Sequence, residues 1–483
     1  MWEQLKKDAQ NDDYNGVMFT ENGAVTFKSS GMKLVDLFFK VGAMRNADED
    51  MIERVIADAW EESPEITTRI MLWARDVRGG AGERRVFRVF LKWLERNGYK
   101  KILISVIYKI PEIGRWDDMF VVHPRYYIDL VAEELYKKNG LLAKWLPREK
   151  SKKWPKLARE IANHLGLSMR QYRKMIAELS KTVEQQMSAN EWEEVNYSQV
   201  PSIAGMRYKN AFMRHDPYRY QDFINKVKSG KEKLNVKVLY PYQVLQMAKR
   251  GDKDADLFWE KLPNYLEKAD GFILPIADVS GSMESIVGGS TTAMDVSTSI
   301  ALYIGDKQPK PWNEIAMSFS AKPKFIVWDE HDNLRNKYRA ITSNGGLNTN
   351  LVGSFELLLS YAKRHNLSQD EMPKYVLVIS DMEFDAAQQY NSWNVERFPK
   401  WNTNYDVIKR KFENAGYKLP LLVFWNVMAR HLGNIPVKFT EKGVALISGF
   451  SPKIMEMVLS LNENKLNPIN LMLETVMQKR YNF

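Results

Sequence analysis

From about residue 266 onward, the chain contains short, continuously apolar runs that alternate with helical patterns. The strand-like runs are residues 271–279, 314–320, 324–328, 374–381, 419–427 and 443–450, and the helical patterns cover residues 292–304, 351–364, 404–415 and 452–461. Strands that are apolar throughout are typical of a parallel sheet with helices on both faces. The sequence therefore predicts a doubly wound, Rossmann-like α/β domain over residues 266–483, with ligands at the carboxyl ends of its strands.

Residues 1–265 follow a different pattern, in which apolar side chains recur every three or four positions. Within residues 51–60, for example, the apolar positions are Ile52, Val55, Ile56, Ala59 and Trp60. This spacing places them on one face of a helix. Short amphipathic helices joined by brief turns usually stack so that each pair covers the apolar face of its neighbour. We expect an α-helical repeat array, HEAT-like in character, that forms a ring or a horseshoe.

Composition excludes several classes of protein. The chain has no cysteine, so disulfides and cysteine-ligated zinc are excluded and a reducing compartment, the cytoplasm, is expected. The polar start of the chain is unlike a signal peptide, and no apolar run is long enough to span a membrane. The net charge is +10, and most of the excess lies in residues 1–265. This asymmetry suggests two units with different partners.

Oxygen-bearing side chains gather where the predicted strands end. Asp278, Ser280 and Ser282 follow the first strand, Asp381 closes the fourth, and Thr349 stands directly before a predicted helix. The carboxyl ends of parallel strands lie along one edge of a sheet, so these side chains are expected to converge. Carboxylate and hydroxyl oxygens suit a hard cation such as Mg²⁺ or Mn²⁺. The alternative for the first segment alone is a polar turn that caps a helix.

This set resembles the metal-ion-dependent adhesion site of the von Willebrand factor A domain. That signature is Asp-x-Ser-x-Ser, then a Thr in a second loop and an Asp in a third. The resemblance implies that Ser280 and Ser282 bind the cation directly, and Thr349 directly or through water. It also implies that Asp278 and Asp381 largely support the ligands or act through water.

The second loop departs from the usual Gly-Gly-Thr, because Leu347 follows the two glycines. Thr349 is the preferred ligand, since Phe355 then takes the place of the first core residue of the following helix; Asn348 is the alternative. Glu383 and Asp385 are expected to be solvated or to support the ligands.

Known catalytic motifs are missing. The Gly79-Gly80 region lacks the Lys-Ser/Thr ending of a phosphate-binding loop, and there is no Gly-x-Ser-x-Gly nucleophile elbow. The six histidines do not stand in a recognisable triad context. We therefore expect a protein that is not an enzyme.

Basic residues cluster at three places in the helical part, two of them interleaved with aromatic residues. The candidate RNA-binding residues are Arg75, Arg78, Arg84 and Arg85; Lys150, Lys152, Lys153 and Lys156, which flank Trp154; and Arg207, Lys209 and Arg214, near Tyr208 and Phe212. Basic side chains attract phosphates regardless of sequence, and aromatic rings stack on unpaired bases. The alternative is that the charges are solvated and the rings belong to the core.

A basic helical-repeat unit followed by an A domain resembles the Ro ribonucleoproteins, in which a TROVE module forms a ring with the A domain. The resemblance is closer to an uncharacterised Ro-like family of plants and phages. The matching stretches are "SSGMKLVDLFF", "ARDVRGGAGERR", "GRWDDMF", "KWLPREKS", "VPSIAG" and "ISDMEFD". The resemblance implies binding of single-stranded RNA ends in a central hole and of small structured RNAs on the outer basic face.

These observations lead to an expected function. The chain is expected to bind RNA on its helical part and to hold Mg²⁺ or Mn²⁺ in its A domain, where the metal recruits an acidic side chain of a protein partner. The main alternative is a metal-dependent adaptor or an assembly protein that binds no RNA. A helper of an ATPase machine is a third possibility.

Overall fold

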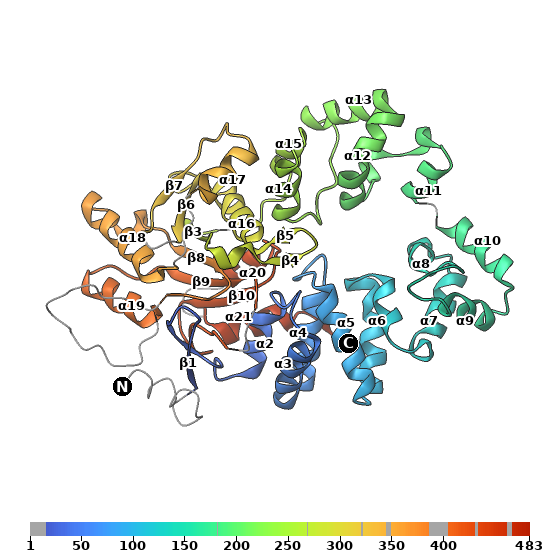
Figure 1. Cartoon of the computed structure of the whole chain (residues 1–483), viewed down its shortest axis with the longest axis horizontal. Helices are drawn as coiled ribbons and strands as arrows, with labels where there is room; N and C mark the ends of the chain where they lie inside the picture. The colour runs from blue at the N-terminus through green and yellow to red at the C-terminus, as the bar shows by residue number, and fades with distance from the viewer. Residues whose placement is uncertain are drawn as a thin grey trace.

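The computed structural model describes residues 16–180, 182–267, 269–319, 322–343, 349–385, 404–429, 433–460 and 466–483. Its N-terminal part is helical, and its C-terminal part contains a six-stranded, mostly parallel sheet (Figure 1). Among the helices in these ranges, none has both the length and the apolar character that crossing a bilayer requires.

The sheet has the strand order β10-β9-β8-β3-β6-β7. Its strands are β3 (Ile273–Asp278), β6 (Ile315–Phe319), β7 (Phe325–Val327), β8 (Tyr375–Ser380), β9 (Leu421–Asn426) and β10 (Val444–Ser448). Each predicted strand run contains one of them. The pairs are parallel except β6 with β7, which is antiparallel. The connection between β6 and β7 is too short for a parallel crossover, so β7 turns back as an edge strand.

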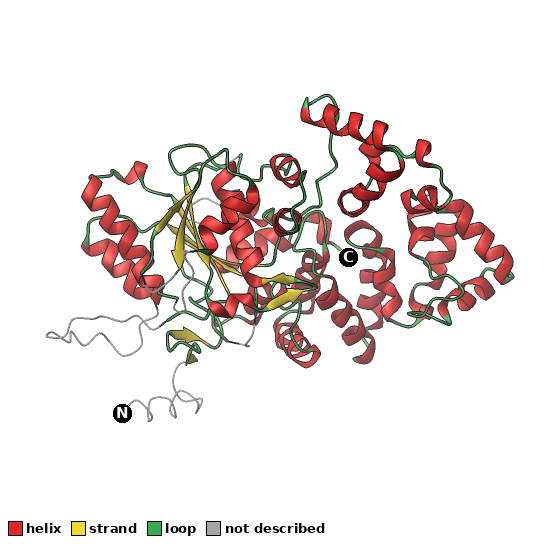
Figure 2. Cartoon of the chain, turned by 45° about the horizontal axis from the view of Figure 1, so that its top comes forward, coloured by secondary structure: helices red, strands yellow, loops and turns green. Residues whose placement is uncertain are grey.

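Helices cover both faces of the sheet (Figure 2). They are α16 (Ala293–Lys307), α17 (Leu334–Thr342), α18 (Leu351–His365), α19 (Asn404–Asn414), α20 (Ile454–Ser460) and α21 (Pro468–Val476). Helix α16 lies on one face, while α18 and α19 lie on the other (Figures 1 and 2). The four predicted helical patterns coincide with α16, α18, α19 and α20.

The helical part consists mainly of short helices. They are α2 (Lys33–Val41), α3 (Glu49–Glu62), α4 (Pro64–Arg75), α5 (Arg84–Arg96), α6 (Lys100–Ile113), α7 (Ile128–Tyr136), α8 (Gly140–Trp145), α9 (Leu157–His164), α10 (Met169–Leu179), α11 (Val183–Ser188), α12 (Ser202–His215), α13 (Pro217–Lys228), α14 (Pro241–Lys249) and α15 (Ala255–Glu260). A two-stranded antiparallel hairpin, β1 (Val17–Phe19) and β2 (Val25–Phe27), precedes them.

Both ends of this helical series pack against the sheet-containing part. Helix α2 contacts β10, and α14 contacts α16 and α17. Between these contacts, helices α6 to α13 extend away from the sheet and α14 returns to it (Figure 1). The phenol of Tyr240, just before α14, donates a hydrogen bond of 3.4 Å to the backbone oxygen of Ala81, which precedes α5. The helical series therefore leaves and rejoins the α/β part at neighbouring positions.

One hydrophobic core runs through both parts. It includes Phe38 of α2, Trp73 of α4 and Trp425 of β9, all buried. The backbone nitrogen of Gly42 donates to the hydroxyl of Ser448 at 2.9 Å, and a side chain at position 42 would clash with the backbone of Ser448. The chain at the end of α2 thus packs directly against the end of β10.

Candidate functional site

The two candidate carboxylates follow neighbouring parallel strands. Asp278 ends β3, and Asp381 comes directly after β8, which pairs with β3. Both side chains lie inside the molecule, with exposed fractions of 0% for Asp278 and 3% for Asp381. The carboxylate of Asp278 accepts hydrogen bonds from the hydroxyl of Ser380 at 2.6 Å and the backbone nitrogen of Ser280 at 2.9 Å. These bonds hold Asp278 in one orientation at the strand end.

The two candidate hydroxyl ligands face each other. Ser280 immediately precedes the short 3₁₀ helix η5 (Gly281–Glu284), and Ser282 lies within it. Their hydroxyl oxygens are 3.0 Å apart. The turn of η5 thus brings two residues of the Asp-x-Ser-x-Ser segment to a common point beside Asp278.

The hydroxyl of Thr349 is turned toward the loop that follows β8. It donates to the backbone oxygen of Glu383 at 2.7 Å and lies 3.3 Å from Oδ1 of Asp385. The backbone nitrogen of Thr349 donates to Oδ2 of Asp385 at 2.8 Å. Thr349 is therefore tied to the loop that begins at Asp381. The alternative ligand, Asn348, lies outside the described residues.

The electrostatics of this edge favour a cation. Burial, together with the nearby charge of Asp381, raises the pKa of Asp278 to about 7. Two carboxylates in a low-dielectric interior cannot both be ionised without a compensating positive charge. In the described residues, no group of three or more His, Cys, Asp or Glu is placed to hold a metal. A cation here would need the serine hydroxyls, and the set of few carboxylates plus hydroxyls fits Mg²⁺, which keeps several waters.

The backbone at this edge is also unusual. Met382, directly after Asp381, has a φ of 68°, in the left-handed region that non-glycine residues rarely adopt. Such residues often occur at functional sites, where surrounding contacts hold them in place. The backbone nitrogen of Met382 donates to the hydroxyl of Ser380 at 3.0 Å, which is one of those contacts.

The N-terminal hairpin forms one wall of this region. Asn22, in the turn between β1 and β2, donates to the backbone oxygen of Glu383 at 2.8 Å and to the hydroxyl of Thr349 at 3.3 Å. The carboxylate of Glu383 accepts from the backbone nitrogen of Glu21 at 2.9 Å and from the side-chain amide of Asn434. Glu383, expected to be solvated or to support the ligands, is 2% exposed and anchors the hairpin.

Two of the candidate RNA-binding residues lie in the interior. Arg75 is 1% exposed, and its guanidinium donates to Asp118 at 2.7 Å. Lys209 is 8% exposed and forms ion pairs with Asp252 and, at 2.6 Å, with Asp254. Buried ion pairs of this kind maintain the fold and present no free charge to a polyanion. Arg75 and Lys209 are therefore not part of the exposed basic surface.

Most of the other candidates are exposed. Arg78 and Arg85 are exposed, but each guanidinium donates hydrogen bonds to backbone oxygens. Arg78 donates to Glu112, and Arg85 donates to Arg45 and Ala47. Arg207 and Arg214 are exposed on α12, and Arg207 lines a cavity of about 790 Å³ between α12, α13 and α14. The lysines at positions 150, 152, 153 and 156 are all exposed.

The structure brings two of the three sequence clusters together. Lys153, although exposed, loses part of its hydration beside these groups, which lowers its pKa, and the charges of Arg88 and Arg84 lower it further. Burial and the charges of Arg88 and Arg115 likewise lower the pKa of Arg84. These four residues, Arg84, Arg88, Arg115 and Lys153, are called the basic cluster below. The sequence gives no sign that Arg115 belongs to it.

Aromatic rings lie beneath the basic cluster. The guanidinium of Arg115 is 3.7 Å from the centre of the Trp145 ring, and the ammonium of Lys153 is 4.3 Å from that of Trp154. Both tryptophans are partly buried against the main core. Each ring therefore packs against the core and also contacts a cation.

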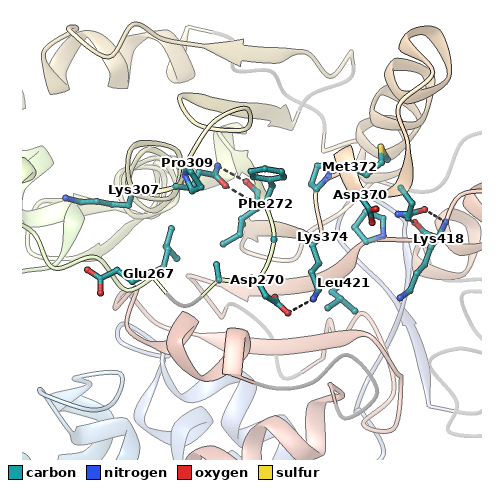
Figure 3. Close-up of a pocket in the computed structure, with 18 of the residues that line it drawn as sticks. Glu267, Asp270, Phe272, Lys307, Pro309, Asp370, Met372, Lys374, Lys418 and Leu421 are labelled. Carbon is teal, nitrogen blue, oxygen red and sulfur yellow. Dashed lines mark hydrogen bonds and ion pairs between the residues drawn. The ribbon is translucent and has the colours of Figure 1, made fainter.

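A separate cavity lies at the opposite edge of the sheet. It has a volume of about 650 Å³ and is lined by the residues that precede β3, β8 and β9, including Phe272, Met372 and Pro420 (Figure 3). Lys374 on its wall is paired with Asp270 at 2.6 Å. Because this cavity is at the amino ends of the strands, it is distinct from the site at Asp278 and Asp381.

Comparisons with known proteins match both parts of the chain. A family described as "Domain of unknown function (DUF2828)" matches residues 20–108 and 127–270, and "Domain of unknown function (DUF7788)" matches residues 273–480. "Uncharacterized protein L728" of Acanthamoeba polyphaga mimivirus is 25% identical over 518 residues, covering 95% of this chain and 87% of that protein. The crystal structure of the Deinococcus radiodurans RO (RSR) protein aligns over 92% of each chain, with a TM-score of 0.37 and 13% identity. The chain is thus similar, over nearly its whole length, to proteins described as uncharacterised or of unknown function.

Proposed function

We propose that the chain is a Ro-like RNA-binding protein rather than an enzyme. Its helical part would form a ring or horseshoe that binds single-stranded or structured RNA, and its C-terminal part would be a von Willebrand A-type domain. The observation that carries the RNA proposal is the basic cluster. Two basic segments that are far apart in the sequence meet there. Loss of hydration lowers the pKa of Lys153, and the charges of Arg88 and Arg84 lower it further.

Such a surface attracts a polyanion. Exposed Lys150, Lys152 and Lys156 extend the positive charge beyond the basic cluster. When these cations replace the counterions condensed on the RNA, its phosphate groups would relieve the repulsion between them. The return of the helical series to the α/β part supports the ring or horseshoe, because both of its ends are held by the same unit.

The proposed metal site belongs to the α/β part. Ser280 and Ser282 would bind Mg²⁺ or Mn²⁺ directly, with the buried carboxylates nearby balancing its charge. When bound, the cation would supply a positive centre to which a carboxylate of a protein partner can coordinate. Thr349 would contribute directly or through water.

A second candidate function is a metal-dependent adaptor or assembly protein that binds no RNA. It is favoured by the buried carboxylate pair and the hydroxyls at the sheet edge, which need no nucleic acid to act. The basic surface binds RNA in the first candidate function and does not bind RNA in the second.

Reversing the charge of the lysine segment distinguishes them. In a variant with Lys150→Glu, Lys152→Glu, Lys153→Glu and Lys156→Glu, we expect RNA affinity to fall at least about 10-fold, because phosphate contacts are electrostatic. Fluorescence anisotropy with a labelled single strand and a labelled hairpin at low salt measures this. All four lysines are exposed, so the fold should be retained.

The matched control carries the same change in charge elsewhere. Lys310→Glu, Lys363→Glu, Arg364→Glu and Lys442→Glu alter exposed cations of the α/β part and should leave most of the affinity intact. Asp278→Ala should also leave it intact, since the metal site belongs to the other part of the chain. An equal loss in both charge-reversal variants would mean that only net charge matters. RNA binding that requires Asp278 would refute the proposed division of roles.

A further inference from the structure

The basic cluster contains more positive charge than its own acids neutralise. Its carboxylates are Asp117 and Asp118 of the 3₁₀ helix η1 (Trp116–Val121), which are 3% and 0% exposed. Around them lie the buried Arg75 and the four cations of the basic cluster. Lys153 belongs here because its ammonium lies over Trp154, whose ring is 5.3 Å from that of Phe120 in η1. Five positive charges against two negative charges leave an excess of three.

The two carboxylates are already occupied by three of the arginines. Asp118 accepts from Arg75 at 2.7 Å and from Arg88 at 2.9 Å. Asp117 accepts two parallel bonds from Arg115, at 2.9 and 2.8 Å. This paired geometry is the strongest arrangement of a guanidinium with a carboxylate. Three guanidiniums are thereby fixed in place.

Arg84 and Lys153 are left over. The guanidinium of Arg84 is 3.7 Å from Asp117 and 3.6 Å from Asp118, which is beyond hydrogen-bonding distance. No described residue accepts a hydrogen bond from it, although its side chain is only 37% exposed. The ammonium of Lys153 lies over the Trp154 ring and likewise has no hydrogen-bond acceptor among the described residues. The donors of both residues are available to a ligand.

We propose that Arg84 and Lys153, supported by Arg88 and Arg115, bind a phosphate monoester, and that in the proposed function this is the terminal phosphate of an RNA strand. The inference rests on the RNA-binding proposal and deepens it. A monoester carries close to two negative charges at neutral pH, whereas an internal phosphodiester carries one. An excess of three positive charges in a partly buried place therefore favours the monoester.

The chemistry of the two available donors fits this ligand. A guanidinium offers two parallel N–H groups to two phosphate oxygens, and an ammonium adds a compact charge on a flexible stem. Lys150, Lys152 and Lys156 are exposed on the same segment as Lys153 and can follow the next phosphates of the strand. The site would thus fix one end of the RNA, and the lysines would hold its continuation.

The test compares RNA ends on one sequence. The same labelled single strand is prepared with a 5′-phosphate, with a 3′-phosphate and with hydroxyls at both ends, and binding to the full chain is measured by anisotropy. We expect one phosphorylated form to bind at least about 10-fold more tightly than the hydroxyl form, because hydrogen bonds between charged groups are the strong ones. In the Arg84→Gln, Lys153→Gln variant that preference should disappear.

A control variant removes two charges elsewhere. Arg364→Gln with Lys228→Gln changes exposed side chains of α18 and α13, outside the candidate RNA-binding residues, and should keep the preference for the phosphorylated end. If the hydroxyl form binds the unmodified protein as tightly as both phosphorylated forms, the inference is overturned while RNA binding stands.

If no RNA binds, the proposed function fails and the terminal-phosphate inference fails with it. The anion site can still be examined with inorganic phosphate. The melting temperature is compared in sodium phosphate and in sodium chloride of equal ionic strength. A higher melting temperature in phosphate that is lost in the Arg84→Gln, Lys153→Gln variant would support a phosphate site even if no RNA binds. Equal melting temperatures in the two salts would mean that the phosphate site is absent as well.

Discussion

Replacing Asp118 by asparagine is expected to lower the free energy of unfolding by about 3–5 kcal/mol, the usual cost of breaking a buried ion pair from one side. Asp118 is 0% exposed and pairs with Arg75, which is 1% exposed. Without the carboxylate, the guanidinium of Arg75 would remain buried and uncompensated. Urea unfolding followed by far-ultraviolet circular dichroism measures the shift.

The control for this variant is an ion pair at the surface. Glu65 pairs with Arg69 one helical turn away in α4, and the Glu65 side chain is 62% exposed. Glu65→Gln should change stability by less than about 1 kcal/mol. If Asp118→Asn has an effect as small as Glu65→Gln, Arg75 is not locked in the interior and becomes a candidate for RNA binding again.

Replacing Ser280 and Ser282 together by alanine is expected to weaken Mg²⁺ and Mn²⁺ binding by more than about 100-fold. Loss of a group that only supports a metal ligand lowers metal affinity by about 10- to 100-fold, so loss of two direct ligands should lower it further. The two hydroxyls lie 3.0 Å apart at the sheet edge, and their removal takes little from the apolar core. Isothermal titration calorimetry of the double variant and the unmodified protein gives the comparison.

Ser285→Ala serves as its control, because Ser285 directly follows η5 and lies outside the proposed ligand set. It should bind the cation as the unmodified protein does. A double variant that still binds Mg²⁺ with unchanged affinity would place the cation elsewhere. Equal melting temperatures for all three proteins without metal would confirm that the fold is retained.

The sheet was predictable because its strands are apolar on both faces. Each of the six runs contains a strand, and Asp278 and Asp381 lie at neighbouring strand ends as expected. The antiparallel direction of β7 was not predicted, since an apolar run does not reveal the direction of its strand. That direction follows from the short connection after β6.

Contacts between distant segments could not be predicted from the sequence. Arg75 and Lys209 look like surface charges in a one-dimensional pattern, and their partners Asp118 and Asp252 each lie 43 residues away. The hairpin contact of Asn22 with Glu383 joins residues 361 positions apart. Burial of a charge depends on the partner that folding brings to it, and a charge pattern along the chain does not contain this information.

The salt dependence of RNA affinity shows whether the lysine segment binds RNA through its phosphates. Anisotropy of a labelled single strand is measured with the unmodified protein and with the variant reversed at Lys150, Lys152, Lys153 and Lys156, over a series of salt concentrations. For a single strand held by phosphate contacts, log K falls against log salt with a slope of about −0.7 per contact. We predict a steep slope for the unmodified protein and a flatter slope with weaker binding for the variant. If neither a single strand nor a hairpin binds more tightly than about 10 μM at low salt, where non-specific attraction is strongest, the chain is not an RNA-binding protein.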